Sequence, residues 1–440
     1  MYLKLTLRNV RRSALDYLLY IFTLAILMAI MSFSNCVSVF AKGIGFQTLA
    51  LPILIVIITS ILVNFINEFM IKQRSNEFAT YILLGIEKEK LTSMFLLELM
   101  LLGLLCSLVG EIIGIVFFSI YYVGNLSSGV NDPLLEIIFK SSFQSLVYFL
   151  FMETISMMLT RRKICRLQIV ELMREKRINQ QLELGKIQPY GVTLLISSAL
   201  FLLLFIGIFS DNKKISMLSV GFVLVPLLIC IYAFFKWIYC RLGLARFKRS
   251  DFFYSGSRLY WIADLTSTSK TSANLNSIFC ISMLFSEMSF IAGEFMLSDS
   301  DILAERVQQH MGFLQISISI IFIVIYFSIL SLTQVMKLKN EVRNAELLFC
   351  MGKTRGEIKT LICSKLLVRL VFPALISFII LGTVAPFINC KLNSVLPSSL
   401  CNLLPKSLGE FSLCFVILYA CYSAIIFVYI NKAITKNIKR

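Results

Sequence analysis

The feature that most constrains this chain is a series of continuously apolar runs, each about twenty residues long, that recurs along its 440 residues. A helix needs about 20 apolar residues to cross a hydrocarbon core of roughly 30 Å, and it satisfies its own backbone hydrogen bonds there. The runs do not alternate as barrel strands would. With 58% hydrophobic and 15% charged residues, the chain has too little polar surface for a soluble globule. The sequence therefore predicts an all-α polytopic membrane protein.

The apolar runs predict about ten transmembrane helices. We place them at residues 15–38, 46–68, 92–122, 141–160, 192–210, 216–239, 276–297, 312–336, 361–388 and 409–431. The first run is long enough to span and no small-residue cleavage site follows it, so we expect it to remain as a helix. Most Lys and Arg residues lie in alternate connecting segments, and the positive-inside rule then predicts that both termini are cytoplasmic. The net charge of +17 follows from this orientation and from contact with anionic lipid, and does not indicate a nucleic-acid partner.

Two segments that are predicted to begin on the cytoplasmic side have similar sequences, Lys72–Glu98 and Lys337–Lys365. Each leaves a predicted membrane helix through charged residues, forms a short amphipathic stretch, stops at a glycine and re-enters the bilayer. Gly85 and Gly352 suit a helix C-cap, where the left-handed conformation has no steric cost for glycine. The repeat predicts two pseudo-repeated four-helix units, residues 1–160 and 276–440, joined by a linker at 161–275 that holds two further helices.

The repeated segments fit two interpretations. Each could dock in the groove of a partner protein, or rest on lipid headgroups. Duplication favours docking, because two sites suit two copies of a partner. The candidate docking residues are Lys72, Arg74, Glu77, Phe78, Tyr81, Leu84 and Gly85 in the first segment, and Lys339, Arg343, Glu346, Leu347, Met351 and Gly352 in the second.

Charged residues also fall at membrane depth, where they are costly unless paired or hydrated. They are Glu98, Glu111, Glu153, Glu287, Glu294, Lys365 and Arg369. These groups could line a central pathway. Alternatively, Glu98, Glu294 and Lys365 lie near helix ends and could reach the interface, whereas Glu111 and Glu153 lie deeper, where we expect pairing between helices. Small residues at 103, 110 and 114 favour close helix packing.

Several chemistries are excluded by composition. The chain has one histidine, His310, and it lies in a predicted outer loop, so we expect neither a histidine metal site nor a Ser-His triad. It has no GxxxxGK[ST] phosphate loop, so any ATP hydrolysis must come from another chain. Cys390 and Cys401 share a predicted outer loop, either as a disulfide or as free thiols.

Three stretches resemble the FtsX-like permeases of ABC transporters, and within them the bacitracin and antimicrobial-peptide resistance subgroup. They are LTLRNVRRSALDYLLYIFTL (5–24), NEFATYILLG (76–85) with Glu98 and the glycines beyond it, and SRLYWIADLTSTSKTS (257–272). The resemblance implies a non-catalytic subunit of the bacterial plasma membrane that docks two copies of a cytoplasmic ABC ATPase. ATP and Mg²⁺ are then bound by the ATPase, and this chain binds no cofactor or metal.

One departure from that subgroup concerns its large extracellular domain between helices 7 and 8. Here that place holds only residues 297–312, which weakens the implied recognition of bacitracin and signalling to a histidine kinase. The resemblance still implies a peptide or lipid-linked substrate, and we expect antimicrobial-peptide resistance or lantibiotic immunity. The alternatives are export of a peptide or lipopeptide made by the same cell, and a non-transporting regulator of an envelope protein.

Overall fold

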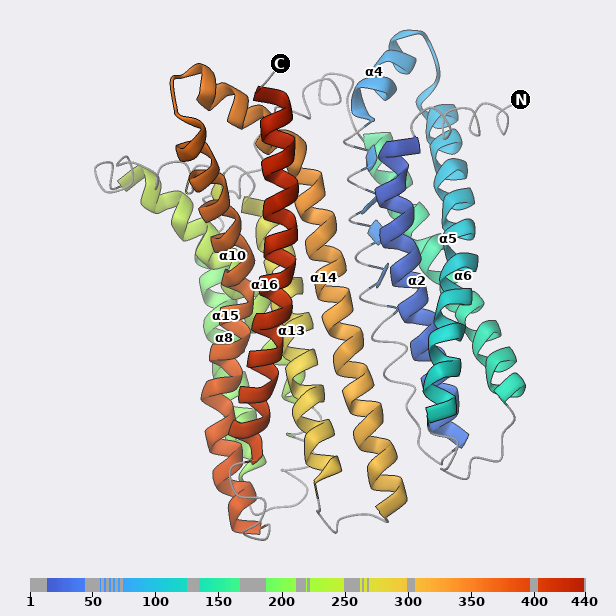
Figure 1. Cartoon of the computed structure of the whole chain (residues 1–440), viewed down its shortest axis with the longest axis vertical. Helices are drawn as coiled ribbons and strands as arrows, with labels where there is room; N and C mark the ends of the chain where they lie inside the picture. The colour runs from blue at the N-terminus through green and yellow to red at the C-terminus, as the bar shows by residue number, and fades with distance from the viewer. Residues whose placement is uncertain are drawn as a thin grey trace. The chain divides into compact units, whose positions relative to one another are not determined.

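The protein is described from a computed structural model, in which the described residues form helices and turns without a strand (Figure 1). The described residues are 14–43, 56, 59–60, 63–64, 66–67, 70–71, 74–124, 134–166, 187–210, 219, 222–248, 262, 265–266, 269–298, 305–395 and 403–438. The helices are α2 (Ala14–Gly43), α4 (Ser75–Leu83), α5 (Lys88–Gly124), α6 (Leu134–Arg166), α8 (Ile187–Ile208), α10 (Leu224–Lys248), α13 (Ser269–Leu297), α14 (Glu305–Cys350), α15 (Arg355–Val395) and α16 (Leu403–Ile438).

The prediction of an all-α polytopic membrane protein is confirmed. Within the described residues, seven helices are long and apolar enough to cross a bilayer, namely α5, α6, α8, α10, α13, α15 and α16. Shorter apolar stretches lie in α2 (Leu24–Phe40) and α14 (Gln315–Ser331). In α8 only 6% of the apolar stretch is buried inside the protein, so the surface of this helix requires a lipid solvent. The predicted span at 46–68 lies largely outside the described residues.

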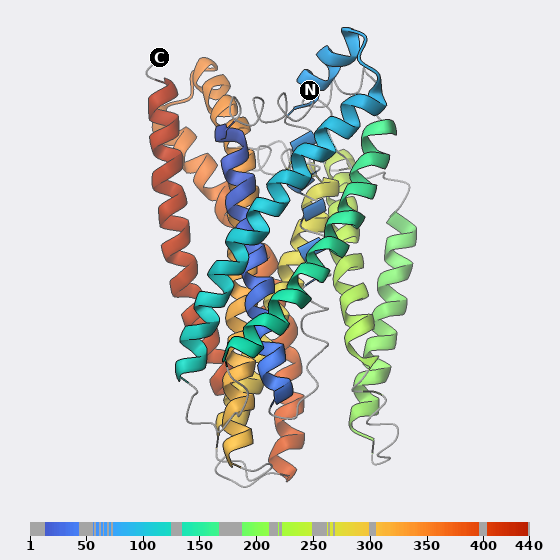
Figure 2. The same ribbon diagram turned by 90° about the vertical axis from the view of Figure 1, so that its right-hand side faces the viewer.

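The chain forms two compact units. Unit 1 comprises Met1–Ile178 with the short pieces Ala304–His310 and Phe327–Leu332, and unit 2 comprises the rest. Figures 1 and 2 show α2, α5 and α6 of unit 1 packed side by side, with α4 at the end where α5 begins. The three-part division at residues 160 and 275 stays a prediction.

Unit 1 is held together by a very close approach of α2 and α5. A Cβ atom built on Gly110 would lie 2.5 Å from the Cβ of Met28, and one built on Gly114 would lie 2.7 Å from the Cβ of Ser32. Only glycine permits this spacing. Small residues let two helix backbones meet and gain dispersion contacts, which is the main attraction between helices in lipid. The packing role expected for these two glycines is therefore visible in the structure.

Buried polar side chains cross-link unit 1 between helices. Asn35 of α2 donates to Ser145 of α6, with 2.8 Å between Nδ2 and Oγ. Asn67 donates to Ser156 of α6 at 2.7 Å. Each of these bonds satisfies polar groups that neither lipid nor water can reach.

Unit 2 packs α13 against α10, α15 and α16. Its apolar core contains Phe235, Cys280 and Leu284. Polar groups are satisfied within this core: Asn276 donates to the Tyr239 hydroxyl at 2.7 Å. The long helix α15 contains Pro373 and Pro386 without ending, which membrane helices tolerate because neighbouring groups take over the freed carbonyls.

Candidate functional site: two helix–turn elements

The two repeated segments form similar helix–turn–helix structures. We call residues 74–98 the first turn element, which comprises α4, the turn at Gly85 and the start of α5. We call residues 341–365 the second turn element, which comprises the end of α14, the turn at Gly352 and the start of α15. The two elements correspond residue by residue when the glycines are aligned.

The turns have the same backbone geometry. Gly85 has φ +89° and Gly352 has φ +88°. In the first turn, the N–H of Gly85 donates to the Ile82 carbonyl at 3.0 Å and the N–H of the next residue donates to Tyr81 at 3.1 Å. The same two bonds recur around Gly352, at 3.0 and 3.1 Å. This pair of bonds is the Schellman C-cap, which satisfies the last carbonyls of a helix and reverses the chain.

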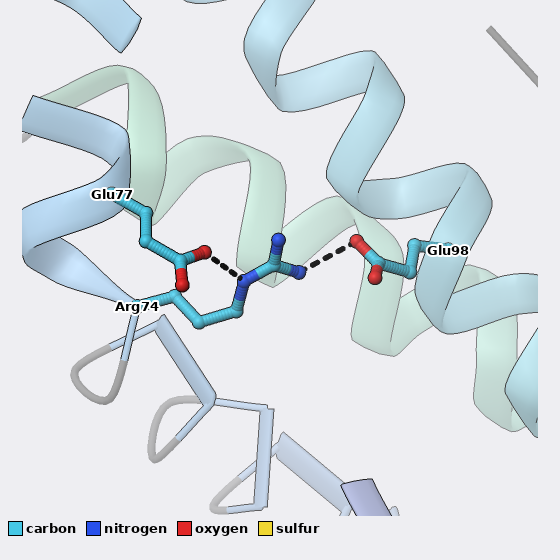
Figure 3. A network of polar contacts seen from close by, with 3 residues as sticks. All are labelled: Arg74, Glu77 and Glu98. Atoms are coloured by element: carbon cyan, nitrogen blue, oxygen red, sulfur yellow. Dashed lines mark hydrogen bonds and ion pairs between the residues drawn. The ribbon is translucent and has the colours of Figure 1, made fainter. Parts of the chain in front are cut away.

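Arg74 lies at the centre of the first turn element, between two carboxylates (Figure 3). Its Nε donates to Glu77 at 2.8 Å, and its Nη1 donates to Glu98 of α5 at 2.7 Å. Arg74 is only 5% exposed and Glu98 only 1%. A buried charge is tolerated when it is paired and hydrogen-bonded, so each of these two residues requires the other.

Aromatic rings enclose the same ion pair. Phe78 of α4 packs edge-on against Phe95 of α5, with ring centroids 5.1 Å apart. The guanidinium carbon of Arg74 lies 5.7 Å from the Phe78 centroid and 5.9 Å from that of Phe95. The rings exclude water from the ion pair and contribute a cation–π attraction. They therefore fix α4 on α5.

The second turn element is held by an apolar cluster. Ala345 of α14 is buried against Ile358 and Ile362 of α15, with Leu348 and Ile426 packed around them. In the aligned register these three buried residues correspond to Phe78, Leu91 and Phe95, which are buried as well. Lys365, at the position of Glu98, is 5% exposed. The burial pattern is thus repeated although the residue types differ.

The tips of both elements expose large apolar side chains. Leu84 is 75% exposed, and Leu83 beside it is also exposed. At the second tip Met351 is 78% exposed, and Leu347 is exposed too. Exposed apolar residues gathered at a defined tip are typical of a contact surface.

The structure corrects two of the predicted docking residues. Arg74 and Phe78 face α5 and are buried, so neither can touch a partner at the tip. Their apolar and charged atoms are used inside the protein. Glu77, Glu346, Leu347, Met351 and both glycines are exposed, as is Leu84, and Tyr81 is half-buried. Lys72 and the side chains of Lys339, Arg343 and Arg369 lie outside the described residues.

The charged residues predicted at membrane depth have different surroundings. Glu98 is bound by Arg74 inside the protein, and Lys365 is also buried. The reach of either side chain to the membrane interface stays a prediction. Ser142 of α6 hydrogen-bonds to Glu111 of α5, which is a pairing between helices.

Glu153 is buried, and among the described residues neither of its carboxylate oxygens has a hydrogen-bond partner. The interhelical pairing expected for it stays a prediction. Opposite it on α5, a Cβ built on Gly103 would be 3.4 Å from the Glu153 Cδ. A glycine offers no side-chain donor to the carboxyl group.

Residues 49–169 match the FtsX-like permease C-terminal family. We call this range the FtsX-like segment. It contains the whole first turn element together with α5 and α6. No curated protein matches the chain significantly. Permeases of this family are membrane subunits that work with a cytoplasmic ABC ATPase.

The second turn element lies outside the FtsX-like segment, yet it has the same capped turn and the same buried positions. The structural likeness between the two elements is therefore independent of the family match. Both the sequence repeat and the backbone geometry support two equivalent elements in one chain.

Sequence reasoning missed two residues with structural roles, Phe95 in the first turn element and Ser377 in unit 2. Phe95 was not singled out, although it lies one helical turn before Glu98 on the same face of α5. Ser377 of α15 was missed as well, and it donates to the buried carboxylate of Glu287 on α13 at 3.0 Å. A serine in an apolar run gives little signal, because serines often bond to their own helix backbone.

Proposed function

We propose that this chain is the membrane-spanning permease subunit of a bacterial ABC transporter, and that its two turn elements each seat one copy of a cytoplasmic ABC ATPase. The observation that carries the proposal is the repeated capped turn with an exposed apolar tip, at Gly85 and at Gly352. The match of residues 49–169 to the FtsX-like permease C-terminal family supports the first of these two sites.

The chemistry of the tips supports a protein partner over lipid. Each tip has apolar side chains at its end, Leu84 and Met351, and charged residues within three positions after the glycine. An amphipathic helix end of this kind inserts its apolar residues into a groove while the charges guide its approach. Two rigid, equivalent tips suit a partner that acts as a dimer.

The proposal divides the work between chains. The partner binds ATP and Mg²⁺ and hydrolyses the nucleotide, because this sequence has no phosphate-binding loop. The permease converts closure of the ATPase dimer into helix movement. The turn elements and both termini are then cytoplasmic, in agreement with the distribution of Lys and Arg.

Docking is tested with charge placed on the apolar tips. We expect Leu84→Glu and Met351→Glu together to reduce capture of the partner ABC ATPase by on the order of 10- to 100-fold, since buried apolar anchors dominate such interfaces. Each single substitution should have a smaller effect, because one site remains. Capture is measured by affinity purification of the tagged permease from membranes.

A matched control is Leu135→Glu. Leu135 is 78% exposed and lies at the start of α6, outside both turn elements, so it should leave capture unchanged. Normal ATPase capture by the Leu84→Glu, Met351→Glu double variant would contradict docking through the tips and would favour the lipid-resting interpretation.

For the biological role we propose resistance or immunity to antimicrobial peptides, with a peptide or lipid-linked target at the membrane. This part is supported only by the sequence resemblance of residues 5–24, 76–85 and 257–272. Deletion of the gene should increase killing by cell-wall-directed peptides such as bacitracin or a lantibiotic. Loss of a secreted peptide would instead indicate export, and a cell-wall defect without either phenotype would indicate a regulator.

A further inference from the structure

The first turn element contains a helix that is too short to be stable alone. Helix α4 has nine residues, and its N-cap residue, Arg74, makes no side-chain capping bond. Isolated helices shorter than about 12 to 15 residues are marginal in water. The order of α4 must therefore come from its contacts with the rest of unit 1.

Several contacts of α4 converge on Arg74. Its backbone N–H donates to the Met70 carbonyl at 3.1 Å, which links α4 to the residues before it. Arg74 reaches Glu98 on α5 at 2.7 Å and Glu77 on α4 at 2.8 Å. It also lies against the Phe78 and Phe95 rings, which come from α4 and α5. The guanidinium thus bridges carboxylates of both helices (Figure 3) and lies against one aromatic ring of each.

The two carboxylates are not equivalent. The side chain of Glu98 is 1% exposed and that of Glu77 is 50% exposed. Exposed ion pairs contribute little, whereas removing one member of a buried pair leaves an uncompensated charge away from water. The bond between Arg74 and Glu98 should therefore dominate.

We propose that Arg74 is a positioning residue that clamps α4 to α5, so that force on the tip at Leu84 moves α5 as one body. Glu98 is its required counter-charge. The purpose of this clamp rests on the proposed function, since an ATPase must push the tip. The clamp itself is a property of the permease and is tested without any ATPase.

The test is hydrogen exchange followed by mass spectrometry on the whole chain in lipid nanodiscs. In Arg74→Ala and in Glu98→Gln, we expect amides of α4 to exchange on the order of 100-fold faster than in the wild type. Amides in the middle of α5 should be unchanged, which excludes general unfolding. Glu77→Ala is the matched control and should alter α4 exchange only slightly.

Charge exchange separates pairing from packing. The double variant Arg74→Glu, Glu98→Lys should recover part of the lost protection, whereas either single reversal should not. If the Arg74→Ala variant does not insert into the membrane, Glu98→Gln still tests whether the ion pair orders α4, because glutamine retains the shape of the site. Wild-type protection of α4 in Glu98→Gln, or no recovery in the double variant, would overturn the clamp.

A second readout concerns transmission of force. In the complex with the ATPase, addition of ATP should change exchange in α5 of the wild-type permease. In Arg74→Ala the ATPase should still be captured, because Leu83 and Leu84 remain, but the change in α5 should be lost. An undiminished response in α5 would overturn the positioning role. If the wild-type permease captures no ATPase, the proposed function is contradicted, whereas the clamp between α4 and α5 is not affected by that result.

Discussion

The two turn elements have one backbone geometry and two different interiors. Both reverse the chain through a glycine with φ near +89° and the same pair of capping hydrogen bonds. The first is a separate nine-residue helix, α4, fixed by the buried Arg74–Glu98 pair and two phenylalanines. The second is the end of α14, a helix of 46 residues, fixed by Ala345, Ile358 and Ile362.

This difference shows that the shape of the element is separable from the forces that hold it. A helix that continues from a long span has its direction set by that span and by the apolar packing around it. A short helix that follows an interruption at Arg74 needs a stronger attachment. We infer that the first element depends strongly on its ion pair. The second element depends less on any one residue of its apolar cluster.

The largest expected effect comes from the helices that follow the turns, α5 and α15. Gly110→Val should destabilise unit 1 by about 3 kcal/mol or more, because a Cβ there would lie 2.5 Å from the Cβ of Met28 and 2.8 Å from the Ala25 carbonyl oxygen. Gly382→Val on α15 is the matched control, since no atom of the described residues lies within 4 Å of its Cβ position. Thermal denaturation in detergent micelles measures both. Equal losses would show that the loss at Gly110 does not come from the close approach of α2 and α5.

The next effect concerns the buried charge of the second element. Lys365 occupies the register of Glu98, and in the sequence Glu341 occupies the register of Arg74, so both signs are reversed. The side chain of Glu341 lies outside the described residues. We expect Lys365→Glu to destabilise unit 2 by about 3 kcal/mol, and Glu341→Arg added to it to restore stability.

This charge-reversal experiment uses the same denaturation measurement. Full stability of Lys365→Glu alone would show that the second element does not require a positive charge at this position. The first element would then require a buried ion pair, and the second element would require none. The two elements would not simply hold the same pair with reversed signs.

A smaller and equal effect is expected at the two glycines. Gly85→Ala and Gly352→Ala should each cost about 1 to 2 kcal/mol, because an L-residue is strained at positive φ. Among the described residues, no atom lies within 4 Å of the Cβ added at either position, so the substitution measures backbone strain. Hydrogen exchange at the preceding helical turns reports each cost locally. A much larger effect at one glycine would show that the turns are not equivalent.

The smallest effect is expected at the start of α15. Thr354 and Glu357 exchange hydrogen bonds between side chain and backbone, with 3.4 Å from the Glu357 nitrogen to the Thr354 hydroxyl. This capping box should make Thr354→Ala cost about 1 kcal/mol. In the first element the same register holds an exposed ion pair of Glu87 and Lys90, and Lys90→Ala should cost less than Thr354→Ala. The reverse order would contradict this assignment.

The sequence by itself determined the class of the protein, the positions of most spans and the two glycine turns. The thickness of a bilayer sets the length of an apolar run, and a capped helix end needs a residue that tolerates positive φ. Both features therefore depend only on the local sequence. Nine of the predicted spans coincide with helices from α2 to α16.

Only the tertiary structure decided which side chains of the turn elements face inward. Arg74 and Phe78 looked like surface residues because a short segment with charges and apolar groups on several faces has no unique buried side. Their direction depends on Glu98 and Phe95, which lie on another helix. The environment of Glu153 likewise depends on the absence of a side chain at Gly103. Such facts arise from the approach of distant segments, which local sequence patterns do not record.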